Sequence, residues 1–224
     1  MSDYKYKYNK YKHKCLKLKS TGCHNYNLNN VIGGSYDMKS RSNMKSKSSV
    51  LYNDVANNVI NIGKFDIVDN KIIAGESLNL VLEMPKGEYN AYKSNNDLII
   101  VHETNKNKIN KEYLEKINFN IVGEIGVDVG KFGFFDFGIA KDNYNKSFFG
   151  VTIPFFNLPK DKDYSLISSH MIADYSTETE KHHLANKYQN KVFGVQSYTG
   201  IGDGFFTCIM SEEDKIAVLL GHIA

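Results

Sequence analysis

The 224-residue chain has no tryptophan, three prolines and three cysteines. The cysteines, Cys15, Cys23 and Cys208, form no dense pattern, which argues against the disulfide framework of small secreted domains. No apolar run approaches the roughly 18–20 residues of a transmembrane helix. The N-terminus lacks an apolar signal core, and Ser2 excludes the usual myristoylation start. We therefore expect an intracellular, reducing location and no secretion.

The residue types that are abundant favour one β-rich domain. Hydrophobic residues make up 42% of the chain, enough for one sizeable core, and the 15 Tyr and 13 Phe favour strands. Asn, Lys, Ile and Tyr are frequent, as in proteins of A+T-rich genomes. The composition resembles that of giant DNA virus proteins, which would place the protein in the host cytoplasm or the virion.

Charge is divided unevenly along the chain. Residues 1–50 hold 11 of the 28 Lys and Arg residues and two of the 25 Asp and Glu residues, a net charge of +9. Residues 51–224 hold the remaining 17 basic and 23 acidic residues, a net charge of −6. We divide the chain into a basic Tyr/Lys-rich tail (1–32), a Gly/Ser/Lys-rich linker (33–54) and a globular domain (55–224).

The tail alternates Tyr and Lys but cannot bury enough surface to order itself. Its lysines could neutralise phosphates without reading sequence, and its tyrosines could stack on single-stranded bases. An acidic protein or lipid surface, or no specific partner, remains an alternative. The candidate nucleic-acid-binding residues are Lys5, Lys7, Lys10, Lys12, Lys14, Lys17 and Lys19.

Short apolar segments separated by turn residues predict a mainly β fold, a single β-sandwich or barrel-like domain with one or two short helices. Helices are expected at 109–117, with Asn110 as N-cap, and at 177–190, where Thr177 and Glu180 fit a capping box. The expected strands cover 59–68, 71–74, 78–84, 88–92, 98–102, 121–128, 132–137, 148–156, 192–198, 205–210 and 215–223.

Three carboxylates are the weak catalytic candidates. Asp128 and Asp136 end apolar strands, and Asp203 lies in the glycine-rich turn 200–204. Converging carboxylates could bind a hard cation or act as an acid/base pair, as in a metal-assisted hydrolase. Each also has a structural interpretation, since Asp-Gly is a common turn dipeptide. The glycines of 123–130 lack the Lys-Ser/Thr ending of a phosphate-binding loop and indicate a bulge or tight corner instead.

We predict no metal site and no cofactor. His13, Cys15, Cys23 and His24 lie close in sequence, but their spacing departs from the paired units of zinc sites. Cys208 lies mid-strand and is expected to be a small buried hydrophobe.

Several short segments carry a resemblance to a known family. They are residues 63–68, 71–74, 85–89, 122–130, 134–136 and 202–206. Their order resembles the uncharacterised domain-of-unknown-function 4241 family over about residues 60–223. The chain departs from the family pattern at 74–77, where Asp-Pro is usual, and at 205–206, where Gly/Ser-Tyr is usual. The resemblance implies a β-rich fold, implies no agreed activity, and singles out Asp128 and Asp203 as matching motif positions.

From these patterns we expect a non-enzymatic binding or structural module whose basic tail makes electrostatic contacts. Two alternatives stay open. One is the metal-assisted hydrolase using Asp128, Asp136 and Asp203. The other is a self-associating homo-oligomer that pairs exposed edge strands or its tyrosine-rich arm.

Overall fold

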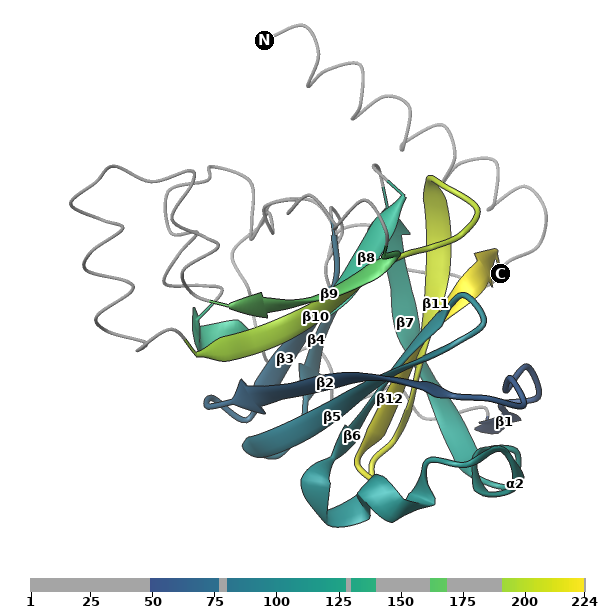
Figure 1. Cartoon of the computed structure of the whole chain (residues 1–224), viewed down its shortest axis with the longest axis horizontal. Coiled ribbons are helices and arrows are strands. Elements are labelled where there is room, and N and C mark those ends of the chain that lie inside the picture. Colours follow the sequence, from purple (N-terminus) through teal and green to yellow (C-terminus); the bar gives the residue numbers. More distant parts are fainter. Residues whose placement is uncertain (1–48, 77–79, 128–129, 140–161, 169–190, 224) are drawn as a thin grey trace, which may run out of the picture. The chain divides into compact units, whose positions relative to one another are not determined.

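The fold is mainly β, as expected. The computed structural model describes residues 49–76, 80–127, 130–139, 162–168 and 191–223. These contain twelve strands, a 3₁₀-helix, a short α-helix and three further helical residues at 137–139 (Figure 1). The elements are β1 (Ser49–Leu51), β2 (Ile60–Ile67), β3 (Lys71–Gly75), β4 (Leu80–Glu83), β5 (Gly87–Ser94), β6 (Asp97–His102), η3 (Glu103–Lys108), α2 (Lys111–Leu114), β7 (Asn118–Val127), β8 (Lys131–Asp136), β9 (Tyr164–Ser168), β10 (Val192–Tyr198), β11 (Gly204–Ser211) and β12 (Ile216–Ile223).

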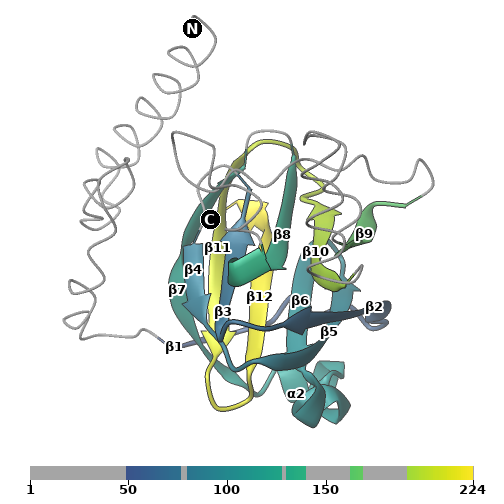
Figure 2. The same ribbon diagram turned by 90° about the vertical axis from the view of Figure 1, so that its left-hand side faces the viewer.

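The strands form two antiparallel sheets that pack as a sandwich. The seven-stranded sheet has the order β1-β7-β11-β12-β6-β5-β2, and the five-stranded sheet has the order β4-β3-β8-β10-β9. At one side the edge strand β2 lies against β9 and β10 (Figure 2). The approach is close, because a Cβ atom added at Gly63 would lie 2.7 Å from Leu166 Cδ1. The described strands change sheet at four connections: β2–β3, β4–β5, β7–β8 and β10–β11.

The centre of the seven-stranded sheet, at β6 and β12, is buried on both faces, which explains the uninterrupted apolar runs of these two strands. In β6, Leu98 and Ile100 face the core between the sheets, whereas Ile99 and Val101 face a second cluster. That second cluster includes Tyr52, which lies just after β1, and residues of α2 and the segment that follows it. One face therefore packs on the five-stranded sheet and the other on the chain around the short helices.

Two glycines on the outer face of the five-stranded sheet accommodate an aromatic ring. A Cβ at Gly133 would lie 2.5 Å from the Phe135 ring and 2.4 Å from the Val195 carbonyl oxygen. A Cβ at Gly194, opposite Phe135 in register, would lie 2.6 Å from the same ring. The Phe135 ring thus packs directly on the backbone of Gly133 and Gly194, and a side chain at either position would clash with it.

The predicted strands are found wherever the chain is described, with three differences. β9 was not predicted, and Ser49–Leu51, in the predicted linker, pairs with β7. Of the helix expected at 109–117, only the four-residue α2 forms, and the 3₁₀-helix η3, which was not predicted, precedes it. Asn110 is its N-cap, as predicted, because its side chain accepts a hydrogen bond from the Tyr113 amide. The predicted strand at 148–156 and helix at 177–190 lie outside the described residues.

Candidate functional site

The structure does not bring the described candidate carboxylates together. Asp128 lies outside the described residues, whereas Asp136 ends β8 and Asp203 is an exposed residue of the β10–β11 loop. That loop contacts the start of β8, since a Cβ at Gly130 would lie 3.3 Å from Gly202 Cα. Asp136 is six residues further along β8, roughly 20 Å away at about 3.3 Å per residue. Asp136 and Asp203 therefore cannot share one cation.

The Asp136 carboxylate accepts hydrogen bonds from backbone amides. Its side chain is buried, with Oδ2 accepting a hydrogen bond from the Val68 amide at 2.6 Å and Oδ1 accepting one from the Ile139 amide at 2.7 Å. Burial raises the pKa of Asp136, and hydrogen bonds from the amides of Ile139, Val68 and Asp69 offset that rise in part. This carboxylate closes the corner after β8 and joins it to the β2–β3 turn.

The two glycine-rich segments do meet, but through turn hydrogen bonds. The Thr199 amide donates to the Gly130 carbonyl at 2.9 Å. The Thr199 hydroxyl donates to the Gly202 carbonyl at 2.8 Å and accepts from the Gly202 amide at 3.0 Å. Within the described residues, no group of three His, Cys, Asp or Glu side chains could hold a metal ion. The contact is therefore the packing of two turns, with φ values of +67° at Gly130 and +88° at Gly202.

A charged cluster that sequence reasoning missed joins the sheets at one end of the core. Lys93 follows Tyr89 and Ala91 on the inward face of β5 and is only 6% exposed at its side chain. Its ammonium donates to Ser197 Oγ of β10 at 2.8 Å and lies 2.6 Å from Asp163 Oδ2. The sequence did hold a signal for this buried lysine. Alternate residues of a strand share one face, so Lys93 is expected to point inward with Tyr89 and Ala91. The ion pair holds the lysine as a charged link between the sheets.

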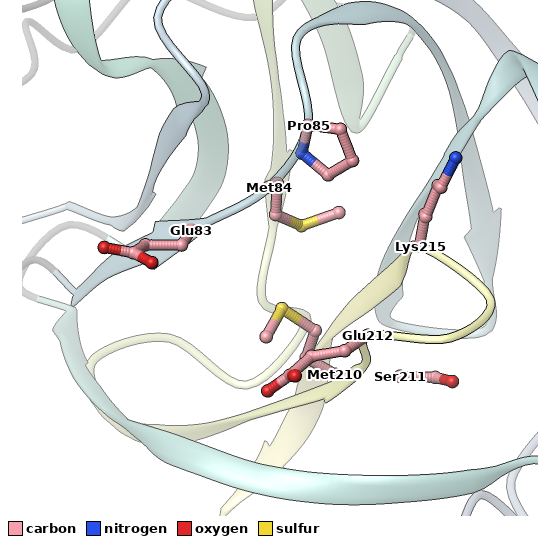
Figure 3. A pocket seen from close by; sticks show the side chains of 7 residues that line it. All are labelled: Glu83, Met84, Pro85, Met210, Ser211, Glu212 and Lys215. Atoms are coloured by element: carbon pink, nitrogen blue, oxygen red, sulfur yellow. The ribbon is translucent and has the colours of Figure 1, made fainter. Parts of the chain in front are cut away.

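The described part of the chain also contains a pocket of about 300 Å³ at the β4–β5 and β11–β12 connections (Figure 3). Met84 and Met210, both nearly buried, face each other across it. Its remaining lining residues are Glu83, Pro85, Ser211, Glu212 and Lys215. No sequence motif marked it, because its two walls are far apart in the chain.

One wall of the pocket rests on a hydrogen-bonded aspartate. Asp214 Oδ1 accepts from Lys108 Nζ at 2.7 Å and from the Tyr113 hydroxyl at 3.0 Å, and its Oδ2 accepts from the Ser211 hydroxyl at 2.9 Å. Burial alone would raise the pKa of Asp214. The hydrogen bonds from Lys108, Ser211 and Tyr113 outweigh it, so this pKa lies below its usual value.

The lowered pKa of Asp214 predicts an acid-dependent contribution to stability. Because the folded-state pKa is depressed, the contribution is present above the ordinary aspartate pKa of about 3.9 and is lost as the pH falls through the folded value. We expect Tyr113→Phe to cost about 1 kcal/mol at neutral pH and less as Asp214 is protonated. Urea denaturation of both proteins at successive pH values measures the gap. A gap that stays constant down to acid pH would contradict the assignment.

No family model, curated protein or solved structure matches this chain. The resemblance to the domain-of-unknown-function 4241 family therefore stays a prediction. The tail lysines (Lys5 to Lys19) lie outside the described residues. Among the described helices, none has the length and apolar character to cross a bilayer.

Proposed function

We propose that the chain is a non-enzymatic binding module in which the basic tail binds nucleic acid through its phosphates and the β-sandwich is a folded carrier. The observation that carries this proposal is the division of charge, +9 in residues 1–50 against −6 in the rest. A negative body repels phosphate, so the affinity resides in the tail. The tail contains lysines, and the only arginine of residues 1–50 is Arg41, so it binds without reading sequence.

The proposal has a quantitative signature in salt. Each lysine that neutralises a phosphate releases counterions, which gives a slope of about −0.7 per contact for single strands in a plot of log affinity against log salt. The tyrosines between the lysines add stacking on unpaired bases. We therefore expect single-stranded oligonucleotides to bind at least as well as duplexes of equal length.

A pair of matched triple variants tests the proposal in the full chain. Lys5, Lys7 and Lys10 are changed to Gln in one, and the exposed body residues Lys86, Lys111 and Lys116 in the other. We expect the tail variant to flatten the salt slope by about 2, because three contacts are lost, and the body variant to leave it unchanged. Fluorescence anisotropy with a labelled single strand between about 50 and 200 mM salt measures both.

A shortened chain completes the test, and the structure fixes where it begins. Residues 43–224 form one compact unit, whereas a start at Val50 would cut into β1. We expect residues 43–224 to show no measurable binding at physiological salt, with circular dichroism confirming the β fold. Equal binding by the full and shortened chains, or by the two triple variants, would refute the proposal.

A further inference from the structure

The pocket between Met84 and Met210 has two walls that are fixed before any ligand arrives. On the first wall, Asn70 accepts hydrogen bonds from the Met84 amide through its carbonyl at 3.1 Å and from the Lys86 amide through Oδ1 at 2.8 Å. The Pro85 carbonyl accepts the Tyr89 hydroxyl at 2.7 Å. A wall held at several points loses little entropy when a ligand binds.

The second wall is fixed by the turn between β11 and β12. The Ser211 hydroxyl donates to Asp214 Oδ2 at 2.9 Å, and the Asp214 amide donates back to Ser211 Oγ at 3.3 Å. The Lys215 carbonyl accepts the His102 amide at 3.1 Å, which ties the end of the turn to β6. The pocket is therefore a preformed feature of the fold.

The lining combines an apolar floor with charged groups at the rim. Methionine is flexible and polarizable, so Met84 and Met210 can adapt to an alkyl chain laid between them. Glu83 and Glu212 contribute exposed carboxylates from opposite walls, and Lys215 contributes one ammonium, a net rim charge of −1. In Figure 3 the Glu83 carboxylate lies to the left of the methionines, the Glu212 carboxylate lies below Met210, and the Lys215 ammonium lies to the upper right.

From this arrangement we infer that the pocket binds a small organic cation with an apolar body, an alkylammonium ion. The alkyl chain lies between Met84 and Met210, and the ammonium pairs with a rim carboxylate, that of Glu83 or that of Glu212. Lys215 on the other side orients the cation toward the carboxylates. The volume of about 300 Å³ lies at the lower end of the range for small-molecule sites, and the acidic body favours cations over anions. The inference is independent of the tail.

Methionine-methyl NMR of the full chain tests this binding. The chain has six methionines, and Met84→Leu and Met210→Leu, which conserve volume, assign the two signals. The probes are hexylammonium, hexanoate and 1-hexanol. We expect hexylammonium to shift the Met84 and Met210 signals saturably and the other four signals little, with hexanoate causing no saturable shift.

Two glutamate variants separate charge recognition from simple apolar filling. We expect the double change Glu83→Gln and Glu212→Gln to weaken hexylammonium binding by about 10-fold or more. Glu213→Gln is the matched control, because Glu213 is exposed in the same turn but does not line the pocket. The inference is overturned by hexanoate or hexanol binding as tightly as hexylammonium, by the absence of a saturable shift, or by an equal effect of Glu213→Gln.

Discussion

Replacing Asp136 by Ala is expected to lower the free energy of unfolding by about 3–5 kcal/mol. The substitution removes the acceptor of the buried Ile139 amide and of the part-buried Val68 amide. Each buried donor without a partner costs about 1–3 kcal/mol. Chemical denaturation of the full chain measures the loss. Asp136→Asn keeps one oxygen acceptor, so we expect an intermediate loss that is measurable even where the Ala variant does not fold.

Asp66 supplies the matched control for this experiment. It lies near the same corner, but its side chain is 45% exposed and its contact with Lys191 is long, at 4.0 Å. We expect Asp66→Ala to change stability by less than about 0.5 kcal/mol. The outcome also separates structure from chemistry, because replacing a catalytic carboxylate commonly leaves stability unchanged or raises it. A stable Asp136→Ala protein would restore this residue as a catalytic candidate.

The second large effect is expected at Asp163. Asp163→Ala leaves the nearly buried Lys93 ammonium with Ser197 as its remaining partner among those described above. Breaking one side of a buried ion pair costs about 3–5 kcal/mol, and we expect about 2 kcal/mol here because the Asp163 side chain is 53% exposed. Lys93→Met, which keeps the length but removes the charge, is expected to change stability by less than about 1 kcal/mol.

A double-mutant cycle makes this asymmetry testable. In the Lys93→Met background, Asp163→Ala leaves no buried ammonium without its partner. The loss in the free energy of unfolding is therefore expected to fall to a few tenths of a kcal/mol. Thermal and urea unfolding of the four proteins give the coupling energy. Equal costs of Asp163→Ala in both backgrounds would show that the contact between Lys93 and Asp163 contributes nothing.

The sequence predicted the strands because two local patterns, alternation of apolar and polar residues and continuous apolar runs, mark them. The alternation at 78–84 and the continuous apolar run Leu98–Val101 report how each strand is buried, and the structure confirms both in the residues it describes. β9 was missed because Tyr164–Ser168 is short and only partly apolar. The Ser49–Leu51 strand was missed for a similar reason, since it continues a Ser/Lys-rich segment.

The candidate site was harder to predict because its geometry is not local. The position of Asp136 after an apolar strand is equally compatible with a catalytic carboxylate and with a backbone cap. The partner that decides between them, the Val68 amide, lies 68 residues earlier in the chain. The methionine pocket poses the same problem, since Met84 and Met210 meet only after the two sheets have assembled.

The place of β12 in the sheet has a consequence for how the domain is made. β12 comes last in chain order among the twelve strands, yet it lies between β11 and β6. Without it, the β1-β7-β11 and β6-β5-β2 groups have no strand to join them. Vectorial synthesis on the ribosome therefore leaves the seven-stranded sheet as two separate halves until residues 216–223 have emerged. We expect a nascent chain halted before residue 216 to expose the unpaired backbone edges of β11 and β6 to chaperones.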